Sequence, residues 1–273
     1  MGDETDFHLT GGGGGIVGRI WSPGEPRFVV LLAHGYGEHA GRYRHVAERL
    51  VASGAVVYAP DHFGHGRSEG ERALVADPDL LVDDFGSVAD LAAGHHPGLP
   101  VVVIGHSMGG IVATRHAQRR GSQLAAVVLS APVIGGNPLL VELLAIDPFP
   151  DVAIEGAMLS RDPAVGQAYL ADPLVYHGGF LRPTLESLVA VVEIIADAGS
   201  LGDLPTLWIH GDEDPLAPYD ATARAMEAVG GTRLHHKLYP GARHEIFNET
   251  NSDEVMGDVE AFLGAVLGPD VVR

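Results

Sequence analysis

Runs of aliphatic residues alternate with amphipathic stretches along most of this chain. The aliphatic runs are continuous rather than alternating in polarity, which is typical of strands buried on both faces. The stretches between them place apolar residues at helical spacing. Because alternating strands and helices form a parallel sheet covered on both faces, the pattern predicts an α/β fold. The expected strands are 27–35, 55–61, 100–106, 125–132, 205–214 and 234–241, and the expected helices are 42–53, 80–93, 108–120, 219–229 and 252–267.

The alternation stops between Val133 and Gly202. This segment contains helical fragments and Asp-Pro turns but no convincing strand. An insertion of roughly 70 residues in an otherwise regular sheet protein is usually functional, for example as a lid. The sequence therefore predicts two parts, which are a sheet core built from 1–132 and 203–273 and a helical cap over 133–202.

A run of glycines, Gly11–Gly15, lies between two short β-prone segments near the start of the chain. This arrangement predicts a hairpin with a loose turn. A phosphate-binding loop is the alternative, but no helix is expected after the run and no Gly-Lys-Ser/Thr triplet occurs. We therefore favour the hairpin.

The 273 residues include 36 acidic and 17 basic side chains, which gives a net charge of −19, and no cysteine. The missing cysteine excludes disulfides, thiolate nucleophiles and cysteine-based metal sites. The negative charge disfavours nucleic acid and anionic membranes as partners. The first residues lack the pattern of a signal peptide, and no apolar run reaches about 18 residues. We therefore expect a cytoplasmic protein. The adjacent histidine pairs lack the spacing of a helical zinc site, so we expect neither a metal nor a cofactor.

The segment Gly105–Gly109 has the pattern Gly-x-Ser-x-Gly. The pattern alone is weak, because a glycine-rich chain of this length produces it by chance in roughly one case of five. Its position between a valine-rich strand and a helix is that of a nucleophile elbow, in which the serine stands on a tight turn. The alternative is a serine that only caps the helix. We favour Ser107 as a nucleophile.

A serine nucleophile needs a histidine base and an acid. In sheet proteins that carry the serine on a nucleophile elbow, these groups follow along the chain in the order serine, acid, histidine. The acid should follow a late strand, and Asp212, Glu213 and Asp214 all do so. The base should follow the last strand, where His244 lies in a loop. The pair at 235–236 lies inside the expected strand and ranks below His244 for that reason. The order of the chain leaves the choice among the three acids open.

An oxyanion hole needs backbone N–H groups that point at the developing negative charge. One donor is expected from Met108, the residue after the nucleophile. The second is expected from the glycine-rich loop 34–37, which follows an early strand. His62 and His65 precede the serine and therefore break the expected order, so we assign them to ordering a loop.

These residues resemble the α/β-hydrolase superfamily, and more closely its monoacylglycerol lipase branch, which is related to a lysophospholipase-like "serine aminopeptidase" grouping. The resemblance implies Ser107 as nucleophile, Asp214 as the acid, His244 as the base, and Tyr36 and Met108 as the oxyanion donors. The matching segments are HGYGEHAGRY (34–43), DHFGHGRSEGER (61–72), PGLPVVVIGHSMGG (97–110), LSRDP (159–163), AYLADPL (168–174), HGDEDPLAP (210–218) and PGARHEIFNE (240–249).

The resemblance also implies where the polar end of a substrate binds. In this family the glycerol end meets charged and tyrosyl groups, and the matching positions here are Glu38, Arg42 and Tyr169. The alternative for Glu38 and Arg42 is a structural ion pair on the first turn of a helix.

The activity that the resemblance implies is hydrolysis of monoacylglycerols through a Ser-His-Asp triad and an acyl-enzyme. A broader carboxylesterase that acts on short acyl or monoalkyl aromatic esters is the alternative, and a non-catalytic binding module on the same fold is a remote one. We expect a small ester or lipid as substrate, at most a transient contact with a lipid interface, and a monomer or homodimer. The apolar segment Pro138–Ile146 fits either a lid helix that lines an acyl channel or a helix packed on the sheet.

Overall fold

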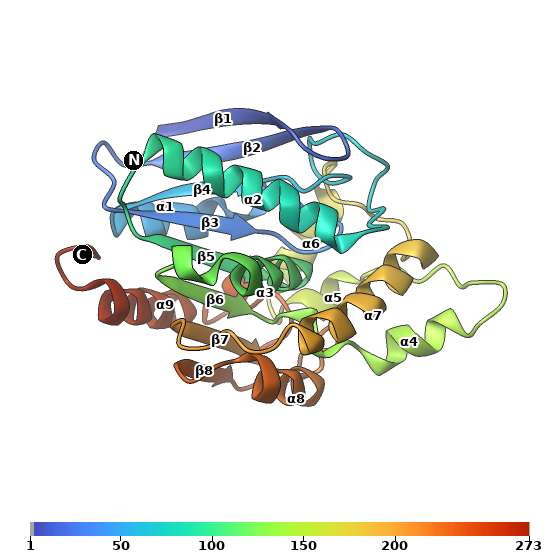
Figure 1. Ribbon diagram of the computed structural model, residues 1–273. Helices are drawn as coiled ribbons and strands as arrows, with labels where there is room; N and C mark the ends of the chain where they lie inside the picture. Colours follow the sequence, from blue (N-terminus) through green and yellow to red (C-terminus); the bar gives the residue numbers. More distant parts are fainter. Residues whose placement is uncertain (1–2, 273) are drawn as a thin grey trace.

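The computed structural model describes residues 3–272, and its centre is one eight-stranded sheet. The strand order is β1-β2-β4-β3-β5-β6-β7-β8 (Figure 1). β2 is antiparallel to both of its neighbours, β1 and β4, and all the other neighbouring strands are parallel. The predicted α/β fold is therefore confirmed. The strands are β1 (Asp3–Thr10), β2 (Gly15–Ser22), β3 (Phe28–Ala33), β4 (Ala55–Pro60), β5 (Val101–His106), β6 (Ala126–Ser130), β7 (Thr206–Gly211) and β8 (Leu234–Tyr239).

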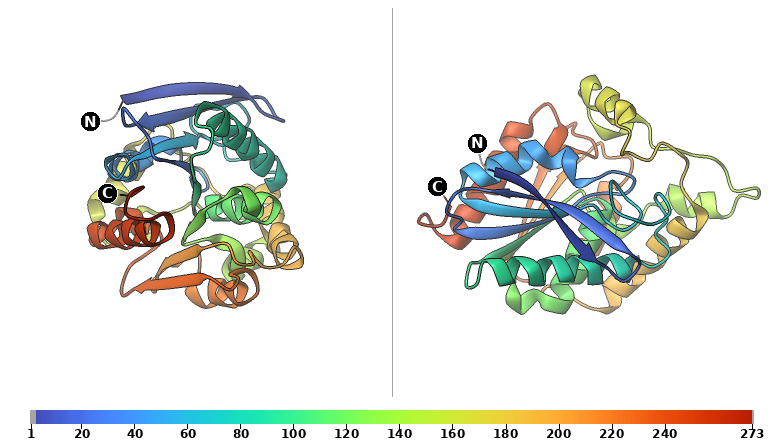
Figure 2. Two further views of the ribbon diagram at one scale, coloured as in Figure 1. Left: turned by 60° about the vertical axis from the view of Figure 1, so that its left-hand side comes forward. Right: turned by 90° about the horizontal axis from the view of Figure 1, so that it is seen from above.

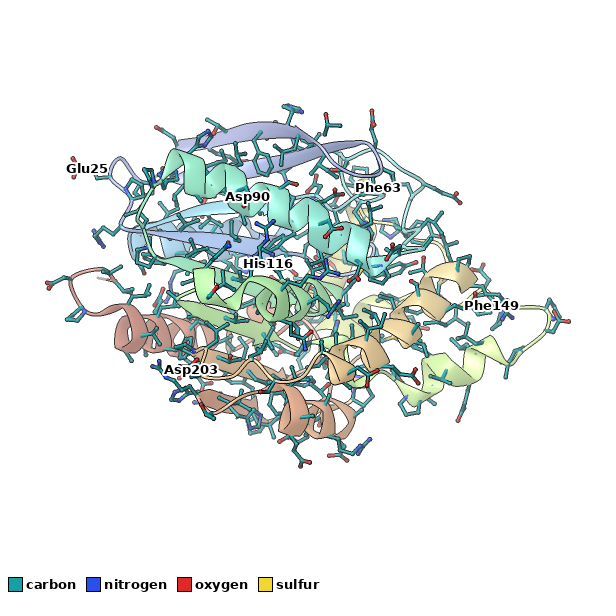
Figure 3. The ribbon with its side chains drawn as sticks, viewed as in Figure 1. Glu25, Phe63, Asp90, His116, Phe149 and Asp203 are labelled. Carbon is teal, nitrogen blue, oxygen red and sulfur yellow. The ribbon has the colours of Figure 1, made fainter. Side chains whose placement is uncertain are left out.

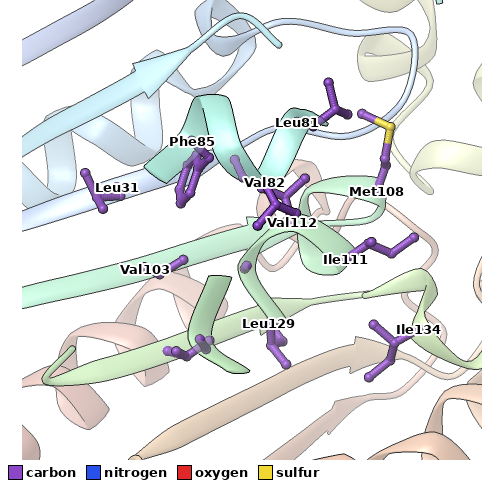
Figure 4. Close-up of a cluster of buried hydrophobic side chains, with 14 of the residues drawn as sticks. Leu31, Leu81, Val82, Phe85, Val103, Met108, Ile111, Val112, Leu129 and Ile134 are labelled. Carbon is purple, nitrogen blue, oxygen red and sulfur yellow. The ribbon is translucent and has the colours of Figure 1, made fainter. Parts of the chain in front are cut away.

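Successive residues of the central strands feed two separate apolar cores, which explains why these strands read as continuous aliphatic runs. Along β3, Val29 and Leu31 face one core while Val30 and Leu32 face the other, as the period of two in a strand requires. Figure 4 shows part of the core that Val29 and Leu31 face, where Leu31 lies near Phe85. Each such fully buried side chain contributes about 1.5–3 kcal/mol through its removal from water.

Helices cover both faces of the sheet (Figure 2). One core packs against α1 and α9, and the other against α2, α3 and α8. Three predicted helices have the expected bounds, and the helix expected over 42–53 begins instead with a 3₁₀ turn at Ala40–Tyr43. The helices are α1 (Arg44–Ala52), α2 (Pro78–His95), α3 (Met108–Arg120), α8 (Tyr219–Val229) and α9 (Ser252–Leu267).

The N-terminal hairpin is confirmed, but its turn is not loose. β1 pairs with β2 from Asp3↔Ser22 to Thr10↔Gly15. The Gly12 amide donates to Asp84 Oδ1 at 2.8 Å, and a Cβ on Gly11 would lie 2.4 Å from the same oxygen. The turn therefore packs directly against α2, and Gly11 and Gly12 leave room for the side chains of Asp84 and Leu80.

Residues 133–202 contain helices and, among the described residues, no strand. Figure 1 shows these helices beyond the carboxyl end of the sheet. Aspartate or asparagine caps two of them, at Asp162 and Asn137, and proline follows at the first helical position. The division into core and cap stays a prediction. The helices are α4 (Pro138–Leu144), α5 (Gly156–Leu159), α6 (Pro163–Ala171) and α7 (Arg182–Asp197).

Helix α4 covers most of the apolar segment Pro138–Ile146 and packs against α7 rather than on the sheet. None of its residues is buried, and Leu139 is 63% exposed. The alternative of a helix packed on the sheet is therefore wrong. None of the helices in the described part of the chain is long and apolar enough to cross a membrane.

Candidate active site

Ser107 stands at the junction between β5 and α3, in the strained turn that a nucleophile elbow requires. Its backbone has φ 56° and ψ −119°, a conformation that a non-glycine residue adopts at a cost of roughly 1–3 kcal/mol. The turn is also crowded, because a Cβ on Gly109 would lie 2.1 Å from the carbonyl oxygen of Ala33. A Cβ on Gly105 would lie 2.2 Å from the carbonyl oxygen of Gly109. Both glycines of the motif therefore have a steric reason.

His244 connects Ser107 to Asp214 in a buried chain of hydrogen bonds. Its Nδ1 lies 2.7 Å from Asp214 Oδ2, and its Nε2 lies 2.8 Å from Ser107 Oγ. An ionised carboxylate only accepts hydrogen bonds, so Nδ1 carries the proton and Nε2 accepts from the serine hydroxyl. The other oxygen of Asp214 accepts from the amides of Leu216 and Ala217 at 2.8 and 2.9 Å. This is the arrangement that activates a serine.

The same contacts shift both pKa values in the direction that favours charge on the pair. Burial by itself raises the pKa of Asp214, but the charge of His244, the hydrogen bonds from His244 and Ala217, and the nearby His210 bring it below its ordinary value. Burial lowers the pKa of His244, yet the Asp214 carboxylate raises it above the ordinary value of a histidine. An imidazolium formed at His244 is therefore stabilised in place.

Asp214, and neither Asp212 nor Glu213, meets the histidine. Asp212 instead accepts from the amide of Gly241, and Glu213 is exposed. His235 and His236 lie in β8, as expected, and the ring of His236 stacks on Trp208 at 4.0 Å between centroids. The structure thus brings one of the three candidate acids to the histidine.

The loop 34–37 and the start of α3 supply two backbone amides beside Ser107. Within residues 3–272 neither Tyr36 nor Met108 donates its amide hydrogen to another atom of the chain. Met108 is the first residue of α3, and amides at that position have no acceptor within the helix. Both residues line the cavity that contains the Ser107 side chain. These two amides are therefore available to an oxyanion, and their role as its donors stays a prediction.

Three neighbouring histidines pack behind this loop. His34 lies 4.4 Å from His62 and 5.5 Å from His65 between ring centroids. The amide of His62 donates to His34 Nε2, and His34 Nδ1 faces the carbonyl oxygen of Gly35 at 2.8 Å. Burial lowers the pKa of His62 to about 3 and that of His65 to about 4. These histidines therefore order the loop as neutral groups, as expected for His62 and His65.

A cluster of charged side chains lines the same cavity as Ser107. Arg42 Nη1 lies 2.6 Å from Glu38 Oε2 and 2.6 Å from Glu245 Oε1, and Arg42 Nη2 lies 2.8 Å from Glu245 Oε2. The second oxygen of Glu38 accepts from the Tyr43 hydroxyl and from the Gly35 amide, at 2.6 and 2.7 Å. Glu38 and Arg42 do form the ion pair considered from the sequence, and they also line the cavity.

Glu245 was missed from the sequence, although it follows His244 directly. Its partner Arg42 lies 203 positions earlier, which local spacing does not reveal. Tyr169, on α6, completes the cluster, because the Arg42 guanidinium lies 5.1 Å from the centroid of its ring. Only two features of the sequence could have pointed to Glu245. It directly follows the candidate base, and Arg42 has one acid, Glu38, at helical spacing and no second one.

One cavity joins these groups, and residues of α4 to α7 line it. The empty space between its lining residues is about 770 Å³ when the open solvent at its mouth is included. The charged cluster and Tyr169 form one end, and aliphatic and aromatic side chains form the remaining wall. The apolar lining residues from the segment 133–202 are Val133, Leu140, Ile154, Leu159, Phe180, Leu185, Leu188 and Val189. The cavity therefore suits a molecule with one polar and one apolar end.

This fold, with a strained serine after β5 and an aspartate and a histidine after β7 and β8, defines an α/β hydrolase. The family model described as "Hydrolase_4: Serine aminopeptidase, S33" matches residues 24–251. The chain belongs to this family.

Curated relatives and solved structures agree with this assignment. The "Monoacylglycerol lipase" of Mycolicibacterium smegmatis is 39% identical over 262 residues, which cover 92% of this chain and 94% of that protein. The human "Monoglyceride lipase" is 32% identical over 247 residues, which cover 85% of this chain and 80% of that protein. The crystal structure of a monoacylglycerol lipase from Paleococcus ferrophilus superposes with a TM-score of 0.76 at 26% identity, covering 97% of this chain and 99% of that one.

Proposed function

We propose that this protein is a monoacylglycerol lipase, a carboxylic ester hydrolase that cleaves a monoacylglycerol into a fatty acid and glycerol. The observation that carries the proposal is one cavity lined by Ser107, by an apolar wall and by a buried charged cluster. The similarity to relatives named as monoacylglycerol and monoglyceride lipases supports the same activity.

In the first step, Ser107 Oγ attacks the ester carbonyl carbon while His244 Nε2 takes the hydroxyl proton. Because Nε2 lies 2.8 Å from Oγ, the base is within hydrogen-bond distance of the nucleophile even without a bound substrate. Asp214 holds the proton on Nδ1 and stabilises the imidazolium. The amides of Tyr36 and Met108 stabilise the oxyanion, and each such donor contributes about 2.7–4 kcal/mol to transition-state stabilisation.

In the second step, the imidazolium returns its proton to the glycerol oxygen, and the ester bond breaks to leave an acyl group on Ser107. Water then attacks the acyl-enzyme, with His244 again as the base, and releases the fatty acid. The residues of this chain suffice for both steps, so the mechanism uses neither a metal nor a cofactor.

The two ends of the cavity orient the substrate. The acyl chain lies against the apolar wall contributed by the helical cap, 133–202, and the glycerol end meets Glu38, Arg42 and Tyr169. Buried carboxylates and a guanidinium offer hydrogen bonds to hydroxyl groups, which the apolar wall does not. A monoacylglycerol has one end of each kind, whereas a short acyl ester leaves the apolar wall unfilled.

The cap also offers a surface for brief contact with a lipid interface. Leu139 on α4 and Leu170 on α6 are 63% and 60% exposed. The net charge of −19 opposes lasting attachment to anionic lipid. Contact during uptake of dispersed or micellar substrate fits both facts. The cytoplasmic location and the oligomeric state stay predictions.

A hydrolysis panel tests the proposal. The purified protein is assayed with mono-, di- and tridecanoylglycerol, a monoalkyl phthalate and a short acyl ester at matched concentrations. We expect the highest kcat/KM for the monoacylglycerol. A clear preference for the short acyl ester or the phthalate would replace the proposal with a broader carboxylesterase, and no turnover of any ester would replace it with a binding module.

A further inference from the structure

The charged cluster at the polar end of the cavity has one positive and two negative groups. Its members are Arg42, Glu38 and Glu245, and the side chains of all three are less than a tenth exposed. Both carboxylates accept hydrogen bonds through both oxygens, from Arg42 and also from Tyr43, Gly35 or Asn248. One guanidinium and two carboxylates give the cluster a formal net charge of −1.

Arg42 is already neutralised and is not free to receive an anion. Burial opposes its charge, but Glu245 and then Glu38 raise the pKa of the guanidinium above its usual range. Its fork is held from one side by both oxygens of Glu245, and Tyr169 covers its face. A carboxylate or phosphate on a substrate would therefore meet two carboxylates rather than an open arginine.

No second arginine or lysine of the described chain offsets the cluster along the cavity, and the positive charge of a protonated His244 is matched by the Asp214 carboxylate at 2.7 Å. Among the residues of the described chain that line it, Arg42 is the only arginine or lysine. Burial and the neighbouring His244 lower the pKa of His106 to about 3, so its ring is neutral.

The cluster is also close to the reacting atoms. A Cβ on Gly35 would lie 2.8 Å from Glu38 Oε1 and 3.1 Å from Ser107 Cβ, so both groups surround the same point. Glu245 is the neighbour of His244 in sequence. The alcohol part of an ester bound at Ser107 therefore comes within several ångströms of the cluster.

We infer that Glu245 is a specificity-determining residue, because it gives the alcohol end of the site a net negative charge that selects uncharged alcohol groups over anionic ones. This inference rests on the proposed function and sharpens its substrate class to esters of neutral polyols. Esters whose alcohol part carries a carboxylate or phosphate are rejected. At roughly 7 Å and an effective dielectric constant of about 20, one unit charge changes the binding of another about fiftyfold.

A matched pair of substrates tests the inference. 1-Decanoylglycerol is compared with the decanoyl ester of glyceric acid, in which a carboxylate replaces the terminal CH₂OH group. For the wild-type protein we expect kcat/KM to be at least about fiftyfold higher for the neutral ester. Glu245→Gln, which keeps the size of the side chain, should lower this ratio at least about tenfold, mainly through a lower KM for the anionic ester.

Glu25→Gln is the matched control, because it removes one negative charge far from the cavity. Figure 3 shows Glu25 at the end of the molecule opposite to Phe149 of the cap segment. This variant should leave the ratio unchanged. An equal effect of both variants would assign the discrimination to the overall charge and overturn the inference.

Other outcomes separate the inference from the function on which it rests. Equal kcat/KM values for the two esters in the wild-type protein overturn the inference without any need for a folded variant, and leave the lipase activity intact. An unchanged ratio in a folded Glu245→Gln sample overturns it as well. Failure of the wild-type protein to hydrolyse 1-decanoylglycerol would overturn the proposed function itself.

Discussion

Replacing Asp214 with asparagine should disable the base without disturbing the fold. Asp214 Oδ1 accepts from the amides of Leu216 and Ala217. An asparagine keeps its carbonyl oxygen at that position, because the flipped amide would leave two buried N–H groups unsatisfied at roughly 1–3 kcal/mol each. Its NH₂ group then faces His244 Nδ1. The histidine must therefore carry its proton on Nε2, where it no longer accepts from Ser107.

The expected loss follows from this tautomer. A wrong tautomer in such a triad lowers kcat about 10⁴-fold, or roughly 5.5 kcal/mol. The assay is steady-state hydrolysis of a p-nitrophenyl acyl ester, because its chromophore reports low rates. Thermal unfolding of the same sample verifies that the variant is folded.

Glu213→Gln is the matched control, since Glu213 is the exposed carboxylate next to Asp214 in sequence. It should retain kcat within about a factor of two, because the charge of an exposed carboxylate is screened by water and contributes little. An Asp214→Asn protein that keeps more than a tenth of the wild-type kcat would refute the reasoning. A Glu213→Gln protein that loses as much would do the same.

Two further predictions concern pH. His244 accepts a proton only when it is neutral. Burial lowers its pKa, but Asp214 raises it above the ordinary value of a histidine. As the pH decreases, kcat/KM should therefore fall with a midpoint above about 6.5. An acid limb centred well below pH 6 would contradict this. Burial lowers the pKa of His62 and His106 to about 3 in the folded protein. Below about pH 6.5 the unfolded chain therefore binds more protons than the folded protein, and the free energy of unfolding decreases as the pH is lowered. Each should cost about 2 kcal/mol at pH 5 relative to pH 7, and an unchanged urea midpoint would contradict it.

Much of the fold was predictable because its information is local. A strand buried on both faces must be aliphatic at every position, so β3 to β7 are visible as continuous runs. Helix α8 and helix α9 have the predicted bounds because their apolar spacing is regular. The strand expected over 205–214 ends at Gly211, since the chain turns there to bring Asp214 to the histidine.

The details that failed depend on residues far apart in the chain. The glycine turn at Gly11–Gly15 was expected to be loose, but Asp84 packs against it from α2. The 3₁₀ turn before α1 places Arg42 between Glu38 and Glu245. Spacing suggested the pair with Glu38, but nothing local indicates Glu245.

The candidate site divides in the same way. The Gly-x-Ser-x-Gly pattern and the order of the chain identified Ser107 and His244, whereas Asp214 was separated from its neighbours only by the resemblance to a family. In the structure the separation has a physical reason, because Asp214 is buried and Glu213 is not. Glu245 was not found, since its role depends on a buried guanidinium from the other half of the chain.

The most direct test of the central claim compares the wild-type protein with Ser107→Ala in the hydrolysis of the monoacylglycerol 1-decanoylglycerol. If Ser107 is the nucleophile, the variant should lose at least about 10⁴-fold in kcat/KM while its thermal midpoint stays close to that of the wild type. A folded Ser107→Ala sample that hydrolyses the ester at the wild-type rate would contradict the account.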